Sequence, residues 1–434
     1  MDRMAWWHEA RYGMMLHWGL YSLKGRGEWV MYHERIPKNE YKKLADLFNP
    51  AHYHPEHWVE LAERAGMKYM VLTTRHHDGF SLFDSKVSDF TAPKTACGRD
   101  LIAEYVEACR KHGMRVGFYF SFLDWMYDAF FLGPKQDPSG WKKLVDYVHA
   151  QLEELMTQYG RIDLIWFDVG AWEPEDWRAV ELHEMMMKHQ PELIITRSQI
   201  GSHYDSCEGS IPFSFGSYPA SDPSQRDWES DMTLHDHWGY CRGDTNWKTP
   251  QTIVRNLARC SSGGGNYLLN VDPKPDGTIP ERPVEILEEV GKWLEINGQS
   301  IYGTVRTKVN FPWGHNGVAT MKDSKLYLHM FYWAEEFALA PCRIDVKKAY
   351  FLATGEPVSF QSRGERICFT GLPKNVPDPL DTVIVLEYEG EPESLESFRK
   401  LEEGCGHEEV RSRDPLKSDS PPPGLDPRGS IVRG

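Results

Sequence analysis

Residues 161–170, Arg-Ile-Asp-Leu-Ile-Trp-Phe-Asp-Val-Gly, form the stretch that decides the fold. From Ile162 to Val169 the stretch is almost continuously apolar and aromatic, as in a parallel-sheet strand that is covered on both faces. Asp168 stands at the end of this run, where a carboxylate is costly to bury unless it has a partner or a task. Taken alone, the stretch gives equal weight to a structural aspartate that caps a following helix and to a functional carboxylate.

The pattern around this stretch recurs along the first 300 residues, because apolar runs rich in β-formers alternate with amphipathic helical runs. Six or seven such units in about 300 residues favour a (β/α)8-like (TIM) barrel over a small open sheet. Residues 201–245 are rich in Ser, Asp, Pro and Gly, and they read as irregular. The expected strands are Tyr12–Trp18, Tyr69–Thr74, Val116–Phe122, Ile162–Phe167, Leu193–Thr196 and Tyr267–Val271, and the expected helices are Pro55–Ala65, Leu101–Lys111, Trp141–Tyr159, Trp177–His189, Thr249–Cys260 and Arg282–Ile296.

The hydrophobic pattern of the sequence changes after residue 299. Short alternating runs such as Leu326–Tyr332 and Val383–Tyr388, punctuated by Gly and Pro, predict an antiparallel β-sandwich domain over residues 300–389. Residues 390–434 contain Glu and Arg clusters and no apolar period, so we expect a disordered or artificially appended tail. The chain thus divides into a barrel over residues 1–299, a C-terminal β-sandwich and a tail.

Composition excludes several classes of protein. The chain has 64 acidic and 49 basic residues, a formal net charge of -15, which argues against a nucleic acid or an anionic membrane as the partner. Its eight cysteines form no C-x-x-C pair and no disulfide framework. Since there is no apolar N-terminal segment and no run of 18 apolar residues, we expect a cytoplasmic protein, or a secreted one if a leader has been removed. The 13% aromatic content suits the stacking of flat sugar faces on rings.

Polar side chains follow the predicted strands at the point where each strand ends. In a parallel barrel these ends meet at one rim, so imidazoles, carboxylates, indoles and a guanidinium are expected to converge there. Such a rim makes a small pocket that can bind a polyhydroxylated ring by hydrogen bonds and stacking. The side chains concerned are His17, His76, His77, Tyr119, Trp166, Asp168 and Arg197.

Metal and cofactor motifs do not emerge from the sequence. His76 and His77 are adjacent at a strand end, so they point in different directions, and no Cys or third His recurs at zinc spacing. Residues 261–265, Ser-Ser-Gly-Gly-Gly, match neither the phosphate loop nor the dinucleotide motif, and no serine lies in a G-x-S-x-G elbow. We therefore expect neither a metal nor a cofactor.

Carboxylate chemistry remains, and acetal cleavage needs two carboxyl groups, one ionised and one protonated. Asp168 is the candidate for the ionised group, and the irregular segment supplies two candidates for its partner. Glu229 lies beside Trp228, where desolvation would raise its pKa, whereas Glu208 lies on a Gly- and Ser-rich loop that can approach a leaving group more freely. Spacing alone does not choose between them.

The motifs, taken together and in order, resemble glycoside hydrolase family 29, the retaining α-L-fucosidases. The resemblance extends over roughly residues 5–300 and depends on eight motifs rather than on one. They are Arg11–Gly19, Glu28-Trp29, Lys68–Phe80, Gly117–Ser121 with Asp124-Trp125, Trp166–Asp168, Trp228-Glu229 with Trp238–Tyr240, Asn246–Thr249 and Gly264–Val271.

The resemblance implies a catalytic barrel followed by a β-sandwich, and metal-independent release of terminal L-fucose through a covalent fucosyl-enzyme. It implies that Asp168 is the nucleophile. Cys207-Glu208-Gly-Ser-Ile-Pro212 is similar to the family segment that carries the acid/base, although Ser-Cys replaces Thr-Pro, so Glu208 is preferred and Glu229 is the alternative. The residues implied around the sugar are His17, Glu28, Trp29, His76, His77, Tyr119, Trp166 and Arg197.

The expected partner is therefore a fucosylated glycan or oligosaccharide, with a homo-oligomer left open. Two alternatives stand beside this interpretation. One is a fucose-binding protein whose barrel has lost catalysis, and the other is a related exo-glycosidase of different sugar specificity.

Overall fold

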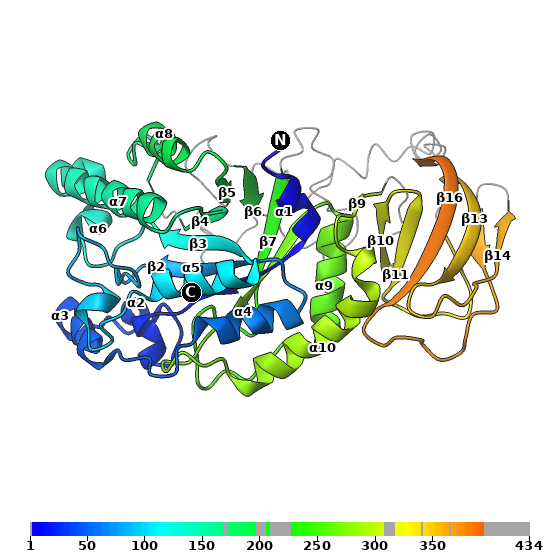
Figure 1. Ribbon diagram of the computed structural model, residues 1–434, viewed down its shortest axis with the longest axis horizontal. Helices are drawn as coiled ribbons and strands as arrows, with labels where there is room; N and C mark the ends of the chain where they lie inside the picture. Colours follow the sequence, from blue (N-terminus) through cyan, green and yellow to red (C-terminus); the bar gives the residue numbers. More distant parts are fainter. Residues whose placement is uncertain are drawn as a thin grey trace, which may run out of the picture.

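The computed structural model describes residues 2–168, 172–196, 205–208, 227–307, 317–339, 342–363 and 366–394. Eight parallel strands close into a barrel in the order of the sequence (Figure 1). Strand β1 pairs with both β2 and β8, which completes the circle. The strands are β1 (Tyr12–Leu16), β2 (Tyr69–Arg75), β3 (Arg115–Ser121), β4 (Leu164–Asp168), β5 (Ile194–Thr196), β6 (Ser206–Glu208), β7 (Asp227–Thr233) and β8 (Asn266–Val271). The predicted barrel is confirmed.

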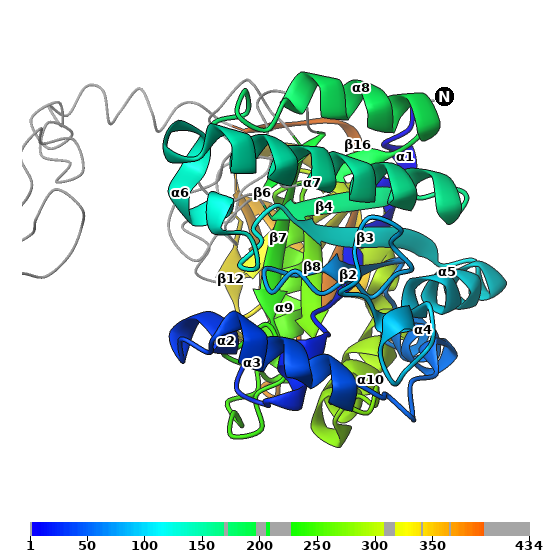
Figure 2. The ribbon, with the colours of Figure 1, turned by 90° about the vertical axis from the view of Figure 1, so that its left-hand side faces the viewer.

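Helices surround the barrel, and Figure 2 shows α7 and α8 on one side with α4, α5 and α10 on another. Their ends follow from the sequence, as in α5, where the Asp100 carboxylate accepts hydrogen bonds from two backbone N–H groups and Gly113 ends the helix at φ 70°. No helix in the described ranges has the length and apolar character to cross a membrane. The helices are α1 (Ala5–Ala10), α2 (Val30–His33), α3 (Lys38–Lys42), α4 (Pro55–Arg64), α5 (Leu101–His112), α6 (Asp128–Gln136), α7 (Pro138–Gln158), α8 (Ala179–His189), α9 (Pro250–Ser262) and α10 (Glu281–Asn297).

Two barrel strands lie where the sequence suggested irregular structure. Strand β6 has only three residues, and β7 carries Asp227, Glu229 and Asp231 at alternating positions. The Glu229 side chain is buried although it is charged in free solution. The expectation for residues 201–245 is therefore wrong for β6 and β7, because a short strand and a polar one both lack the apolar run that marks a barrel strand.

The second unit is built from two antiparallel sheets, of five strands (β13-β16-β11-β10-β9) and three strands (β12-β15-β14). Leu328, Ile384 and Phe369 are among the buried residues of its own core. Figure 1 shows it beside α9 and α10. The strands are β9 (Val305–Arg306), β10 (Gly317–Lys322), β11 (Lys325–Met330), β12 (Phe337–Ala338), β13 (Cys342–Phe351), β14 (Phe360–Arg363), β15 (Arg366–Phe369) and β16 (Thr382–Ser394).

The predicted boundary after residue 299 falls between α10, which ends at Asn297, and β9, which begins at Val305. Strand β16 continues to Ser394 by pairing with β13, so the prediction of a tail is wrong for residues 390–394. Main-chain hydrogen bonds extend this strand through a segment that has no apolar period. Residues 395–434, the rest of the expected tail, lie outside the described residues.

Candidate active site

Asp168 is the last residue of β4, and its side chain is 23% exposed. Its Oδ2 atom accepts a hydrogen bond of 2.8 Å from the Tyr119 hydroxyl of β3 and lies 3.5 Å from Nε2 of His77. Register explains the first contact, because Asp168 pairs with Ser121 and Tyr119 with Trp166 on the neighbouring strands. The end of β4 thus presents a carboxylate whose outer edge reaches solvent.

An aromatic floor lies beside this carboxylate, and nearly all of it is buried. Tyr119 stacks on Trp166 with ring centroids 5.1 Å apart, and His76 stacks on Tyr119 at 5.6 Å. His17 packs edge-on against Tyr119 at 4.9 Å. Burial lowers the pKa of His76, and the neighbouring His77 and His17 lower it further. His76 is therefore a neutral imidazole at pH 7, able to exchange one hydrogen bond in each direction with a hydroxylated ligand.

The hydrogen bonds of His77 fix which ring nitrogen faces Asp168. Its Nδ1 lies 2.6 Å from the Ser121 hydroxyl, and that hydroxyl donates its proton to the Leu123 carbonyl at 3.1 Å. Since the serine proton is already used, the Ser121 oxygen accepts and Nδ1 of His77 donates. Nε2 is then the nitrogen that lies against Asp168.

A similar arrangement orients His17, which directly follows β1. Its Nδ1 lies 2.6 Å from Oδ1 of Asn270, and Nδ2 of Asn270 donates to the Trp238 carbonyl at 2.7 Å. Because a carbonyl can only accept, the Asn270 amide is fixed in this orientation and Nδ1 of His17 is the donor. The Trp238 ring lies 5.2 Å from the His17 ring, so the β7–α9 connection reaches the site.

Glu28 joins the site from the segment before α2 and is buried. Its Oε2 accepts a hydrogen bond of 2.7 Å from the backbone N–H of Gly239, beside Trp238. Burial raises the pKa of Glu28, and the backbone hydrogen bonds oppose that rise. Trp29 follows, and its ring meets His77 edge-on at 5.1 Å.

The two candidate partners of Asp168 lie side by side in the sheet but in different positions along their strands. Glu208 pairs with Glu229 and is the last residue of β6. Glu229 is the third residue of β7, and its Oε2 accepts a hydrogen bond from the hydroxyl of Tyr69, the first residue of β2. The side chain of Glu208 lies outside the described residues.

Strand register places the Tyr69 contact of Glu229 far from Asp168. Tyr69 pairs with Arg115 and Asp168 pairs with Ser121, so six residues of β3, about 20 Å of strand, separate the two levels. The Tyr69 ring also lies over Gly13 near the start of β1, where an added Cβ would meet it at 2.4 Å. The Glu229 carboxyl therefore lies toward the N-terminal end of the barrel, and the structure does not bring it to Asp168.

Arg197 directly follows β5 and lies outside the described residues. Ser121 and Asn270, which orient the two histidines, were not among the predicted site residues. A signal for Asn270 was present, because Asn266 and Asn270 interrupt an apolar run at a spacing of four and so face the same side of β8. Ser121 ends the Gly117–Ser121 motif, but nothing in its spacing marked it as a residue of the site.

A cluster of His235, His237 and Asp244 near this site has donor atoms within 4.8 Å of one another, as a metal site would. Nδ1 of His235, however, already accepts the backbone N–H of His237 at 3.0 Å. Oδ2 of Asp244 accepts from Nδ1 of His237 at 2.7 Å and from the backbone N–H of Asp236 at 3.0 Å. Both ring nitrogens of His235 also face carboxylates, since Nδ1 lies 3.0 Å from Oδ2 of Asp244 and Nε2 lies 2.9 Å from Oδ2 of Asp272. We therefore interpret the cluster as a brace for the loop that carries Trp238.

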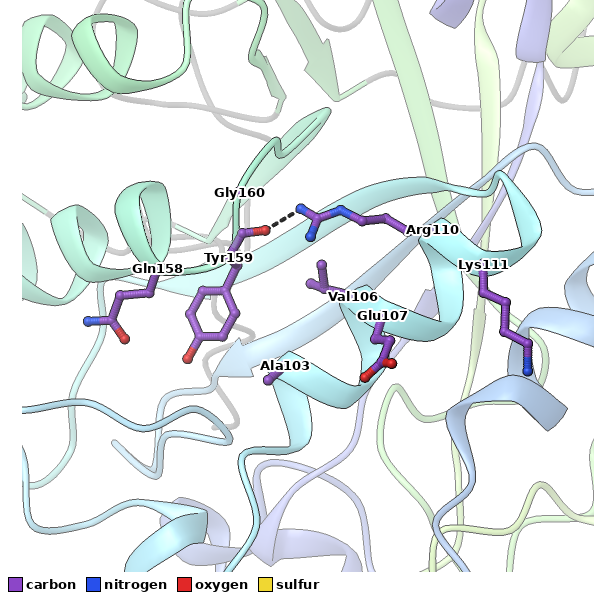
Figure 3. Close-up of a pocket in the computed structure, with 8 residues that line it drawn as sticks. All are labelled: Ala103, Val106, Glu107, Arg110, Lys111, Gln158, Tyr159 and Gly160. Carbon is purple, nitrogen blue, oxygen red and sulfur yellow. Dashed lines mark hydrogen bonds between the residues drawn. The ribbon is translucent and has the colours of Figure 1, made fainter.

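A hollow of about 520 Å³ lies elsewhere, between α5 and the end of α7 (Figure 3). Arg110 crosses it and donates to the Tyr159 carbonyl. Helices α5 and α7 end where β3 and β4 begin, so the hollow lies at the opposite end of the barrel from Asp168. Its lining residues are Ala103, Val106, Glu107, Arg110, Lys111, Gln158, Tyr159 and Gly160.

A closed parallel barrel that presents a carboxylate at a strand end, between a phenol and an imidazole and above an aromatic floor, defines a barrel glycoside hydrolase. A family model described as alpha-L-fucosidase matches residues 1–299. The chain therefore belongs to the α-L-fucosidase family.

Individual relatives agree with this membership. The chain is 30% identical to the tissue alpha-L-fucosidase of Homo sapiens over 410 residues, 86% of each chain. It is 37% identical to alpha-L-fucosidase isoenzyme 1 from Paenibacillus thiaminolyticus, with a TM-score of 0.82 over 90% of this chain and 99% of that one. A Bacteroides thetaiotaomicron GH29 alpha-L-fucosidase, 26% identical with a TM-score of 0.82 over 90% and 97% of the two chains, was trapped as a covalent intermediate with 2-fluoro-fucosyl fluoride.

Proposed function

We propose that this protein is an exo-acting retaining α-L-fucosidase that hydrolyses terminal α-linked L-fucose from glycoconjugates or oligosaccharides. The observation that carries the proposal is Asp168 at the end of β4, hydrogen-bonded to Tyr119 at 2.8 Å beside His77. The family membership supports it, as does the covalent intermediate of the Bacteroides relative.

The reaction proceeds in two displacements. Asp168 attacks the anomeric carbon and forms a glycosyl ester, while the bond to the leaving oxygen breaks and that oxygen takes a proton from a carboxylic acid. The resulting carboxylate then removes a proton from water, which attacks the same carbon and restores the free Asp168 carboxylate. Because the contacts with Tyr119 and His77 both involve Oδ2, we assign Oδ1 as the attacking atom.

Glu208 is our candidate for the acid/base. It ends β6 and so lies at the carboxyl ends of the strands, as Asp168 does. Glu229 has a suitable pKa, which burial raises to about 7, but its hydroxyl partner is Tyr69 at the other end of β2. Position along the strands, rather than pKa, is what supports Glu208 over Glu229.

The sugar is held by groups whose orientation is fixed by hydrogen bonds. His17 and His77 each offer Nε2, since their Nδ1 atoms are held by Asn270 and Ser121. His76 adds a neutral imidazole, and the Trp166 and Tyr119 rings provide the apolar surface on which the C5-methyl side of fucose packs.

Proton NMR during hydrolysis of 4-nitrophenyl α-L-fucoside tests this function. The first sugar product is expected to be α-fucose, which then mutarotates. Binding of the fucoside without release of fucose would favour a silent binding protein. Cleavage confined to another member of an aryl glycoside panel would favour a different exo-glycosidase.

A further inference from the structure

An aromatic ladder leads from Asp168 to the protein surface, and its outermost member has no part in the reaction described so far. We define the ladder as His77, Trp29, Trp125 and Tyr32. The His77 ring, next to Asp168, contacts Trp29 at 5.1 Å and Trp125 at 5.3 Å. Tyr32 contacts Trp29 and Trp125, each at 5.5 Å.

Exposure increases along the ladder. His77 and Trp125 are 2% and 3% exposed, Trp29 is half-buried, and Tyr32 is 51% exposed. The floor formed by His17, His76, Tyr119 and Trp166 is buried throughout. The ladder is thus an aromatic path that continues from Asp168 outward into solvent.

The Tyr32 ring is held in place although half of it faces water. It lies on the short helix α2, and its backbone N–H donates to the Trp29 carbonyl at 3.0 Å. Trp29 meets it edge-on at an interplanar angle of 85°, and Trp125 lies against it at 32°. A ring fixed by two indoles loses little freedom when a ligand stacks on its open surface, which makes it a suitable sugar platform.

We propose that Tyr32 forms the subsite for the saccharide unit to which the fucose is attached. This inference rests on the proposed function. Fucose occupies the floor next to Asp168, so the unit that departs must lie further out, and Tyr32 stands two ring contacts beyond Asp168, through His77 and Trp29. The phenol ring stacks on the apolar face of that unit, and exposed His33, stacked on Trp29 at 5.7 Å, lies beside its hydroxyl groups.

Two substrates separate this role from a structural one. α-L-Fucosyl fluoride has no sugar in its leaving group, whereas fucosyl disaccharides of the α-1,2, α-1,3 and α-1,6 linkages do. Tyr32→Ala is expected to lower kcat/KM for the best disaccharide by about three- to tenfold, the usual size of an aromatic stacking contact, and to leave fucosyl fluoride unchanged. Tyr32→Phe keeps the ring and should retain most of the disaccharide activity.

Tyr332→Ala is the matched control, since Tyr332 is also an exposed tyrosine, at 60%, but follows β11 in the sandwich. If the disaccharides are cleaved too slowly for kinetics, they can be measured as inhibitors of fucosyl fluoride hydrolysis. Tyr32→Ala should then raise their inhibition constants by the same factor of about three to ten. Unchanged disaccharide kinetics, or an equal loss on fucosyl fluoride, would overturn the subsite. A parent enzyme that hydrolyses fucosyl fluoride upholds the proposed function whatever Tyr32 does, and one that leaves it intact overturns both.

Discussion

At the scale of single residues, Glu229 is a buried carboxyl with a raised pKa that lies far from Asp168 along the strands. Burial raises the pKa of this carboxyl to about 7, a value that suits a general acid. The side chains of Tyr69 and Trp7 oppose this rise, but burial outweighs them. The raised pKa is therefore a cost to the folded state.

This cost predicts a pH-dependent stability. The pKa of Glu229 rises from 4.5 to about 7 on folding, so the stability is highest below pH 4.5 and falls as the pH rises to about 7. At about 1.4 kcal/mol per pKa unit, the difference between 4.5 and about 7 corresponds to at most about 3–4 kcal/mol. Glu229→Gln keeps an acceptor for Tyr69 and cannot ionise, so its gain in unfolding free energy should be small at pH 4.5 and largest above pH 7.

Urea unfolding of the parent and of Glu229→Gln at pH 4.5, 6 and 8 measures this difference. A gain that does not change with pH would show that folding does not raise the pKa of Glu229. The variant should also keep most of the activity, since the Glu229 carboxyl does not reach Asp168.

At the scale of elements, the candidate reactive side chains lie at the carboxyl ends of the barrel strands. Asp168 ends β4, while His17 and His76 follow β1 and β2, and these groups meet in one site. Because Glu208 ends β6 and Glu229 lies inside β7, removal of the two carboxyls should have different consequences.

Glu208→Ala is expected to slow the cleavage of fucosyl disaccharides by about 10²–10⁴-fold, because their leaving oxygen needs a proton. Formation of the fucosyl-enzyme from fucosyl fluoride should be slowed much less, because fluoride leaves without a proton. Azide should accelerate the breakdown of this fucosyl-enzyme, since an anionic nucleophile needs no general base. The comparison of kcat/KM for the two substrates measures the effect, with Glu229→Gln as the control. A larger loss for Glu229→Gln than for Glu208→Ala would reverse the assignment.

The same scale shows how far the sequence could predict this protein. Apolar strands such as β2 and β8, and the polar groups that follow them, were recognisable because burial on both faces leaves a continuous apolar run. Strand β7 was not, since its interior positions hold polar groups that only the closed barrel satisfies, as Tyr69 does for Glu229. The tautomers of His17 and His77 depend on Asn270 and Ser121, which are distant in sequence, so no local pattern could reveal them.

At the scale of the whole molecule, a buried hydrogen-bonded pair lies where the barrel meets the sandwich. Nδ1 of His329 on β11 lies 2.6 Å from Oδ2 of Asp381, and both side chains are fully buried. The Asp381 carbonyl accepts from the indole N–H of Trp293 on α10. Burial raises the pKa of Asp381, and His329 opposes that rise, so the pair depends on both partners.

His329→Ala leaves Asp381 buried without its partner and is expected to lower the unfolding free energy by about 3–5 kcal/mol. Lys325→Ala, which removes an exposed pair with Glu387 from the same strand, should cost no more than about 1 kcal/mol. Thermal and urea unfolding of both variants measures the two costs. Equal effects would show that the junction does not depend on the buried pair.

Trapping with 2-deoxy-2-fluoro-α-L-fucosyl fluoride tests the central claim most directly. The fluorine at C2 slows both formation and hydrolysis of the covalent intermediate, whereas the fluoride leaving group speeds its formation. The intermediate therefore accumulates. Mass spectrometry of the digested enzyme should find one fluorofucosyl group, on the peptide that carries Asp168. Attachment to any other residue, or an active enzyme that takes up no label, would contradict the assignment of Asp168 as the nucleophile.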